Sequence, residues 1–154
     1  MPQLGLALGM RWQRVLPQLS PLTQFPGAVF AYSLQDISGT NPNVVRVRRA
    51  IDNAEPDFKA IDTLNGAIET FCGVGGGFVS VWYDQSGSGN DLVQTVAGEQ
   101  PRIVNAGSIE TFGGFPAIRN LGGSYSLDFS TGVDFASDFS IYYPVSHTSF
   151  GTTV

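Results

Sequence analysis

The 154-residue sequence contains a single cysteine, Cys72, a single histidine, His147, and a single lysine, Lys59. One cysteine excludes an internal disulfide and a cysteine-built zinc site, and one histidine argues against a metal site built from several histidines. We therefore expect no metal and no other cofactor. The length corresponds to one domain.

Charge is scarce as well, because Asp, Glu, Lys and Arg make up 14% of the residues, roughly half of the usual share. The net charge of -5 gives no attraction to a nucleic-acid backbone, so we expect no nucleic-acid partner. The sequence lacks an apolar run of about 18 residues, which predicts no membrane-spanning helix. It is also too apolar for an ordinary disordered tail.

The charges are distributed unevenly along the chain. Residues 1–35 contain Arg11 and Arg14 but no acidic residue, and Asp36 is the first carboxylate. Prolines exclude a long helix in residues 1–26. We predict that residues 1–26 form an extended apolar arm for attachment and assembly, followed by a folded domain of residues 27–154. The apolar side chains of this assembly arm are Leu4, Leu6, Leu8, Trp12, Val15 and Leu16. A chain terminus whose hydrophobic residues have no partner is the alternative.

Short β-prone segments, separated by turn residues, dominate the rest of the sequence. They are residues 28–34, 44–49, 78–83, 92–96, 102–105, 108–112, 117–119, 124–129 and 139–143. Their spacing is typical of an all-β fold, a β-sandwich or jelly roll. Residues 140–154 remain strand-like, and a bare sheet edge promotes aggregation. We therefore expect another chain to cover that edge.

One short helix is predicted among these strands. Asp62 or Thr63 can cap its first turn, and Gly73 ends it. Its apolar positions are Leu64, Ala67, Ile68, Phe71 and Cys72. This spacing places Cys72 on the buried side of the helix, where we expect a structural thiol and not a nucleophile.

Residues 44–49 read VVRVRR and predict a half-buried strand. Val45 and Val47 would face the core, while Arg46 and Arg48 would form a basic outer face. Acidic residues follow, which predicts an ion-pair cluster of Arg46, Arg48, Arg49, Asp52 and Asp57. A recognition site for an acidic sugar or a partner carboxylate is the alternative. If one of the adjacent arginines is buried, we expect its partner to be Asp52, Asp57 or Asp84.

The most distinctive string is WYDQSGSGNDL, residues 82–92. Asp84, Ser86, Ser88 and Asn90 have the spacing of a calcium loop, but Thr95 stands where such a loop needs a bidentate Glu. We therefore predict a polar turn in which Asp84 and Asn90 hydrogen-bond local backbone amides and the glycines adopt positive φ. The candidate residues of this structural motif, or possible ligand loop, are Trp82, Tyr83, Asp84, Asn90 and Asp91.

This string resembles the WYDQSGNGNDL signature of concanavalin-A-like, laminin-G-like β-sandwich domains. Such domains occur in alpha-L-arabinofuranosidase B enzymes and in bacteriophage tail-fibre and other virion proteins. The resemblance also includes residues 45–57, 71–78 and 100–107, and so extends over residues 27–129. It implies a jelly-roll sandwich in which Asp84 fixes a loop after the Trp82 strand. No residue matches the catalytic carboxylates of the enzymes, so the resemblance implies the fold and not the chemistry.

The resemblance favours a structural component of a bacteriophage virion, such as a tail-fibre, head-fibre or decoration subunit. Such a protein is not an enzyme. It would lie on the particle surface, with other virion proteins and copies of itself as partners. A carbohydrate-binding module for a host-surface glycan is a second hypothesis.

An arabinofuranosidase-like hydrolase is a third hypothesis, which needs two facing carboxylates. The available acids are Glu110, Asp128, Asp134 and Asp138, and no spacing singles out a pair. Tyr142 and Tyr143, near His147, could offer at most one sugar platform, because adjacent strand residues point to opposite faces. We expect core or interface packing for them instead.

Overall fold

The computed structural model describes residues 20–130 and 132–133. The elements are α1 (Pro21–Gln24), β1 (Asn43–Arg49), β2 (Asp57–Lys59), η1 (Ala60–Thr63), α2 (Ala67–Cys72), β3 (Gly77–Trp82), β4 (Leu92–Val93), η2 (Ala97–Glu99), β5 (Arg102–Asn105), β6 (Ser108–Ile109), β7 (Thr111–Phe112), β8 (Phe115–Pro116) and β9 (Asp128–Phe129). Most elements are strands in antiparallel sheets, so the predicted all-β class is confirmed.

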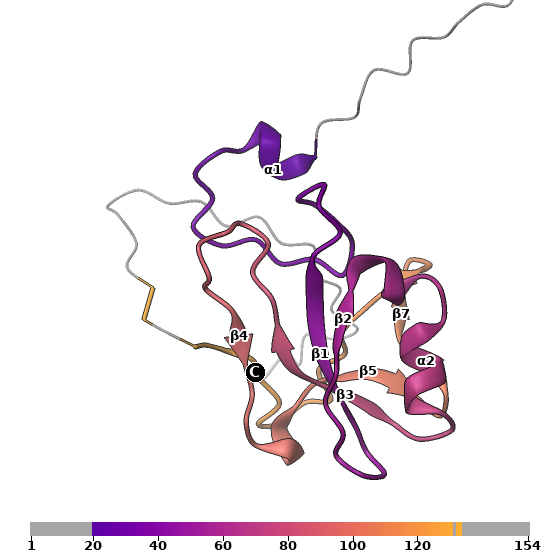
Figure 1. Cartoon of the computed structure of the whole chain (residues 1–154). Coiled ribbons are helices and arrows are strands. Elements are labelled where there is room, and N and C mark those ends of the chain that lie inside the picture. The colour runs from indigo at the N-terminus through magenta and orange to yellow at the C-terminus, as the bar shows by residue number, and fades with distance from the viewer. Residues whose placement is uncertain (1–19, 131, 134–154) are drawn as a thin grey trace, which may run out of the picture.

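The larger sheet is built around β1 and β3 (Figure 1). One edge of β1 pairs with β2, and its other edge pairs with β3. The far edge of β3 pairs with β5 near its beginning and with β4 near its end. The sheet continues from β4 to β9 and from β5 to β6, while β7 and β8 form a separate hairpin.

The pairing register gives the sheet two unlike faces, because directly paired residues share a face. One row is apolar and consists of Phe58, Val45, Trp82, Leu92 and Phe129. The neighbouring row, on the opposite face, consists of Asp57, Arg46, Val81, Val93 and Asp128. The first row belongs to the core face and the second to a mixed polar face.

Helix α2 packs against β1, β5 and β6 at the beginning of β3. Ile68 and Cys72 of this helix are buried, which confirms the predicted environment of the thiol. Burial raises the pKa of Cys72 to about 11. A β-carbon on Gly77 would lie 2.6 Å from the Cys72 sulfur, so this close approach requires glycine.

Three of the predicted strands, residues 44–49, 78–83 and 102–105, form as β1, β3 and β5. The structure shortens or divides others. Within residues 92–96 only β4 forms, and within residues 124–129 only β9 forms. Residues 108–112 are divided between β6 and β7. Arg119 makes a single bridge to Arg102 in place of a strand over residues 117–119. The predicted strand over residues 139–143 lies outside the described residues.

The prediction for residues 28–34 was wrong, because they form no strand. Their backbone bonds polar side chains of residues 84–90 in place of a neighbouring strand, as described below. This segment crosses one end of the large sheet (Figure 1).

The predicted helix begins later than expected. The buried Thr63 hydroxyl donates to the Leu34 and Ala60 carbonyls, and the chain then turns through Gly66 at a φ of 82°. Leu64 is consequently exposed, and α2 begins at Ala67. Gly73 ends the helix as predicted.

A second helix, α1, lies within residues 20–26 of the predicted arm. Ser20 caps it and Pro21 opens it, so this part of the arm is not fully extended. The Leu22 N–H donates to the Ile37 carbonyl at 3.1 Å, which ties α1 to the following chain. The six apolar residues of the assembly arm lie outside the described residues. Among the residues described, no helix has the length and apolarity to span a membrane.

Candidate functional site

Residues 84–91, here called the signature loop, are organised by the Asp84 carboxylate. Its Oδ1 atom accepts backbone N–H groups from Ala31 and Ser86, both at 2.8 Å. Its Oδ2 atom accepts the Ser86 hydroxyl at 2.7 Å and the Asn90 N–H at 3.2 Å. Gly87 and Gly89 have φ values of 88° and 75°. The predicted polar turn forms around Asp84, and four donors already occupy its carboxylate. The Asn90 side chain, however, bonds the distant Val29 carbonyl and not a local amide as predicted.

The loop also binds the segment that crosses it. The Asn90 side-chain amide donates to the Val29 carbonyl at 2.7 Å. The Tyr32 hydroxyl donates to the Asn90 carbonyl, and burial raises the pKa of Tyr32. Asp91 accepts the Asp84 N–H at 2.9 Å, which closes the loop on itself. Within residues 20–130 and 132–133, no cluster of three potential metal-ligating Asp, Glu, Cys or His side chains occurs.

Gln85 is a structural residue that the sequence analysis missed. It is buried, and its Oε1 atom accepts the Ile37 N–H at 3.0 Å. Its Nε2 atom donates to the carbonyls of Ser33 and Gln35. Gln85 therefore fixes the far part of the crossing segment. Its place inside the distinctive string was the available signal, but an uncharged amide in a turn gives no hint of such distant partners.

On the core side of the loop, Trp82 packs against Tyr32 with ring centroids 5.6 Å apart. Phe30 and Phe129 complete an aromatic group around Tyr32. The Trp82 indole N–H is buried and has no acceptor among the residues described. Trp82 therefore contributes apolar packing below the loop.

The predicted arginine cluster is divided into separate contacts. Arg46 lies on the polar face, where its guanidinium bonds both oxygens of Asp57 at 2.7 and 3.2 Å. The Tyr83 hydroxyl donates to the same carboxylate at 2.7 Å. The hydrogen bond from Arg46 lowers the pKa of Asp57, whereas burial and the bond to Asp57 raise the pKa of Tyr83 to about 12.

Arg49 forms a second ion pair, with Asp52, at 2.6 Å. Its guanidinium also donates to the Phe71 carbonyl and lies 4.5 Å from the centroid of that ring. These contacts hold Arg49 at the beginning of β3, away from Arg46. Four residues of the predicted cluster therefore form two separate ion pairs and not one cluster.

The predictions for Arg48, a solvent-facing position or a carboxylate partner, were wrong. It is buried and not part of a solvent-facing basic surface, and its hydrogen-bond partners are not carboxylates. Its three nitrogens donate to Gln100 Oε1 at 2.6 Å, Asn53 Oδ1 at 2.9 Å and the Ala97 carbonyl at 3.0 Å. Neutral oxygens therefore surround this buried cation, and η2 covers it. The Phe78 ring, 5.0 Å from the guanidinium, completes the environment.

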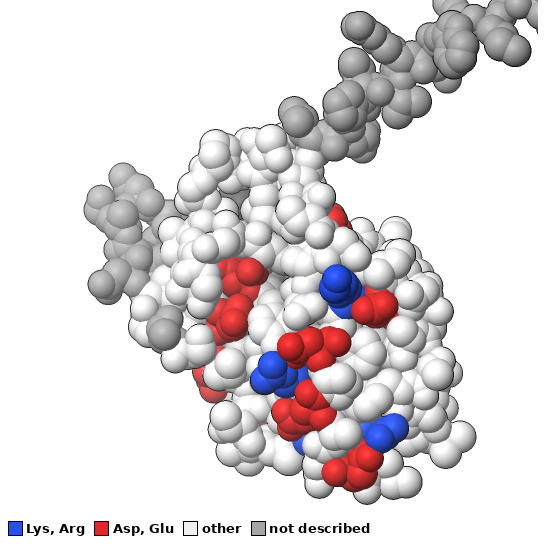
Figure 2. Space-filling model, viewed as in Figure 1, with Lys and Arg blue, Asp and Glu red and all other residues white. Residues whose placement is uncertain are grey.

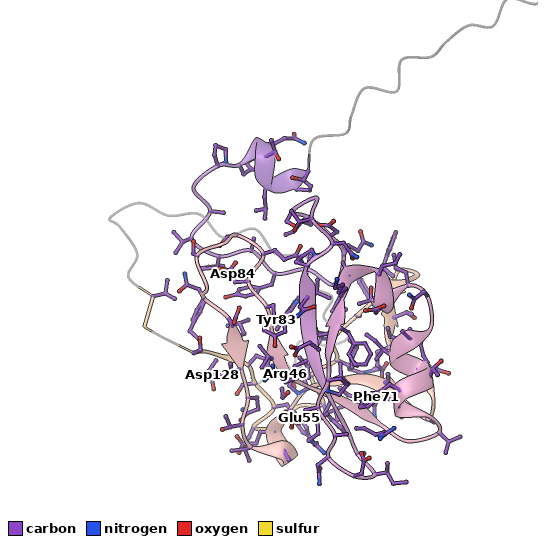
Figure 3. The ribbon with its side chains drawn as sticks, viewed as in Figure 1. Arg46, Glu55, Phe71, Tyr83, Asp84 and Asp128 are labelled. Atoms are coloured by element: carbon purple, nitrogen blue, oxygen red, sulfur yellow. The ribbon has the colours of Figure 1, made fainter. Side chains whose placement is uncertain are left out.

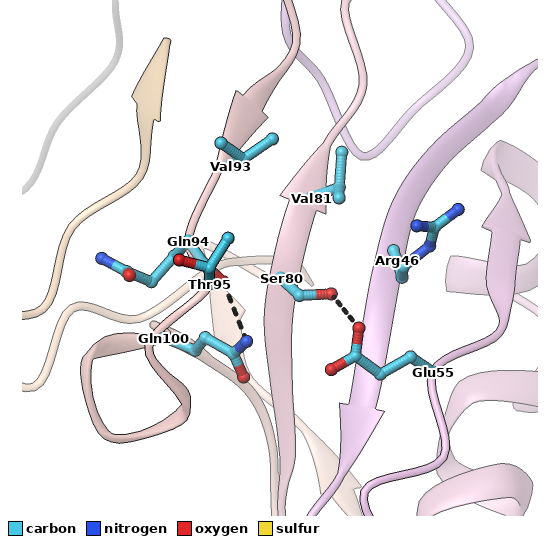
Figure 4. A pocket seen from close by; sticks show the side chains of 8 residues that line it. All are labelled: Arg46, Glu55, Ser80, Val81, Val93, Gln94, Thr95 and Gln100. Carbon is cyan, nitrogen blue, oxygen red and sulfur yellow. Dashed lines mark hydrogen bonds between the residues drawn. The ribbon is translucent and has the colours of Figure 1, made fainter. Parts of the chain in front are cut away.

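A groove of about 320 Å³ lies on the polar face between β1, β3 and the residues after β4 (Figure 4). Its lining residues are Arg46, Glu55, Ser80, Val81, Val93, Gln94, Thr95 and Gln100. The pairing between β1 and β3 slips by one residue at Ser80, which brings both Ser80 and Val81 to this groove. The Ser80 hydroxyl donates to Glu55 Oε2 at 3.1 Å.

The deep wall of the groove is held by two buried glutamines. The Gln100 side-chain amide donates to the Gln94 carbonyl at 2.9 Å, and its oxygen accepts from Arg48. Gln94 Oε1 accepts the Val96 N–H at 2.9 Å. The side chains of both glutamines are therefore engaged in hydrogen bonds within the wall of the groove. The exposed rim carries Glu55 and Thr95.

Charged side chains of both signs alternate across the middle of this face, with acidic groups in the majority (Figure 2). Tyr83, Arg46 and Glu55 follow one another along the sheet in Figure 3. No protein-family model, curated protein or solved structure matches the chain. The likeness to concanavalin-A-like domains therefore rests on the residues of the signature loop and the segments around it.

The acids considered for hydrolysis are not brought together. Arg102 and Arg119 bind Glu110 at 2.6 and 3.3 Å, and Asp128 lies at the edge strand β9. Asp134 and Asp138 lie outside the described residues, as do Tyr142, Tyr143 and His147. Glu110 and Asp128, the two of these four acids that the structure describes, therefore belong to separate contacts.

Proposed function

We propose that this chain is a structural component of a bacteriophage virion, a tail-fibre, head-fibre or decoration-type subunit. In this proposal a lectin-like jelly-roll sandwich faces outward on the particle, and residues 1–26 mediate assembly. One observation carries the proposal: the Asp84, Gln85 and Asn90 side chains of the signature string all bind the protein's own backbone. A string used in this way supports a structural role for the loop, because these three side chains hold the crossing segment and the loop itself.

Assembly with other copies is supported by the surface of the described domain. The two phenylalanines of the β7–β8 hairpin, Phe112 and Phe115, are directly paired across it. The β7–β8 hairpin exposes Phe112 and Phe115, at 58% and 61% of their surface. These features fit a protein that functions beside other subunits.

Purified particles test the proposal directly. Mass spectrometry of density-purified particles from the source lysate should detect the chain at a fixed ratio to the other particle proteins. If the chain stays in the soluble fraction, the proposal is wrong.

The role of the arm has its own test. A full-length variant with Leu4, Leu6 and Leu8 changed to serine should lose particle association and fall to a smaller mass in light scattering. A matched variant with Gln3, Gln13 and Gln18 changed to serine should behave as the wild type. Equal behaviour of the two variants would remove the arm from the proposal.

A carbohydrate-binding module for a host-surface glycan is the second candidate. The groove on the polar face favours it, because polar rim groups surround a narrow apolar floor. This activity is compatible with a place on the particle surface.

A further inference from the structure

We propose that the groove on the polar face binds one saccharide unit that carries no acidic group. This inference deepens the carbohydrate-binding candidate and rests on it. It differs from the acidic-sugar site that the sequence analysis gave as an alternative, because the structure commits those arginines to other partners.

The charges around the groove decide the class of sugar. Arg46, the arginine that lines it, is bound through two nitrogens to Asp57. Glu55 on the rim is bound by the Ser80 hydroxyl through Oε2 only, which leaves Oε1 without a protein donor in the described chain. A carboxylate oxygen of this kind accepts hydroxyl or ammonium protons and repels a uronate or sialate. Neutral and amino sugars satisfy this requirement.

The floor of the groove suits the other side of a sugar ring. Val81 and Val93 are directly paired across β3 and β4, so they form a short apolar strip (Figure 4). The C–H groups of a pyranose can cover such a strip while its hydroxyls reach the rim. Glu55, on the β1–β2 connection, and Thr95, after β4, lie on either side of Ser80 and below the two valines in Figure 4. The Thr95 hydroxyl has no protein partner in the part of the chain that the structure describes.

The groove is also fixed in shape before a ligand arrives. The buried Arg48 holds Gln100, which in turn holds the Gln94 backbone. Fixed walls reduce the entropy lost on binding. The volume of about 320 Å³ is at the small end of ligand sites, which matches a single sugar unit.

Calorimetry with the full-length chain tests this proposal. The probes are three sets of oligosaccharides: neutral hexose and N-acetylhexosamine oligomers, glucosamine oligomers, and oligogalacturonate with sialyllactose. We expect binding to at least one probe of the first two sets and none to the acidic set. Absence of binding to all neutral and amino probes would overturn the proposal, and so would preferred binding of the acidic probes.

Paired variants locate the site. Glu55→Gln and Thr95→Val should each weaken binding about tenfold. The first replaces a charged acceptor with a neutral amide, and the second removes a hydroxyl that bonds the sugar. The controls make the same chemical changes outside the groove, Glu99→Gln on η2 and Thr111→Val on β7, and should bind as the wild type. Circular dichroism and the melting temperature confirm that all four variants are folded.

If binding occurs but all four variants bind equally, the sugar lies elsewhere and the proposal is wrong. Because the binding assay uses the isolated chain and particle association is measured separately, the two proposals fail independently. A chain found in particles that binds no sugar would overturn only the groove proposal.

Discussion

The two ends of β3 are held to the rest of the molecule in opposite ways. After Trp82, the signature loop binds the crossing segment of residues 28–37 through side-chain hydrogen bonds over more than 50 positions of sequence. Before Phe78, Gly77 allows α2 to approach the sheet because it lacks a side chain. The end of β3 at Trp82 is therefore held by polar side chains of the signature loop. The end at Gly77 is held by close packing that is possible only because Gly77 has no side chain.

Removal of the Asp84 carboxylate should have the largest effect on this comparison. Asp84→Ala leaves the N–H groups of Ala31, Ser86 and Asn90 without their acceptor. We expect a loss of about 3 kcal/mol in the free energy of unfolding, because bonds to a charged acceptor are strong and water can replace only some of them. Urea denaturation measures the loss, and hydrogen exchange should show early opening of the Ala31 amide.

Asp84→Asn is the matched variant for this measurement. It keeps one acceptor oxygen in nearly the same shape, so its loss should fall between the wild type and Asp84→Ala. Unchanged exchange of the Ala31 amide in Asp84→Ala would show that the crossing segment is held by other contacts.

Gly77→Ala tests the packed end of β3. The new methyl group would lie 2.6 Å from the Cys72 sulfur and 3.1 Å from the Val104 β-carbon, so α2 or β5 must shift. We expect a loss of about 2 kcal/mol, typical of overpacking. Gly98→Ala is the control, since nothing lies within 4 Å of its new β-carbon.

A second substitution identifies the clash. In the background of Cys72→Ala the sulfur is gone, so Gly77→Ala should cost less than it does in the wild type. Equal costs in both backgrounds would assign the strain to the contacts with Val104 and with Val47, whose Cγ1 lies 3.2 Å from the new methyl group.

The difference between the two ends of β3 also explains which elements could be predicted from the sequence. Alternating and β-branched residues identified β1, β3 and β5, and Gly73 marked the end of α2, because these signals are local. Residues 28–34 have the same β-prone composition but form no strand. Their backbone partners are Asp84, Gln85 and Asn90, and no local pattern shows that a distant polar loop will replace a neighbouring strand.

The candidate site was harder to predict for a related reason. Proximity in sequence predicted that arginines and acids of residues 46–57 would pair, and Arg46–Asp57 and Arg49–Asp52 do so. Arg48 was misplaced, because its burial depends on η2 and Gln100, about 50 residues away along the chain. The groove depends on the same distant residues and on the one-residue slip at Ser80, and neither has a signal in the sequence.

Alkaline pH should weaken the packed end through Cys72. Its pKa is raised from 9.0 to about 11, so the folded protein holds this proton more tightly than the unfolded chain. The resulting stability is complete below pH 9 and is lost as the pH rises toward 11. We expect a loss of about 2 kcal/mol between about pH 8 and about pH 11. Denaturant midpoints of the wild type should therefore fall further than those of Cys72→Ala, and parallel decreases would contradict this assignment.

Tyr83 provides the internal reference for that experiment. Its pKa is raised to about 12, so it contributes a similar loss in both proteins and does not affect their difference. The difference in tyrosinate absorbance between the wild type and Tyr83→Phe reports when Tyr83 itself begins to ionise, because four other tyrosines also absorb. Its onset above the midpoint of Cys72 would keep the two effects separate.

Asp36 also accepts several backbone N–H groups, as Asp84 does, but its removal should cause the smallest loss in the free energy of unfolding. Its oxygens accept the N–H groups of Ser38 and Gly39 at 3.0 and 2.7 Å and that of Asn41 at 2.8 Å, all within the same exposed turn. Asp36→Ala should cost about 1 kcal/mol, because an exposed local turn exchanges these bonds for water. Urea denaturation of Asp36→Ala beside Asp84→Ala measures the difference. Equal losses would mean that the number of hydrogen bonds to an aspartate, and not the distance in sequence that they bridge, determines its contribution to stability.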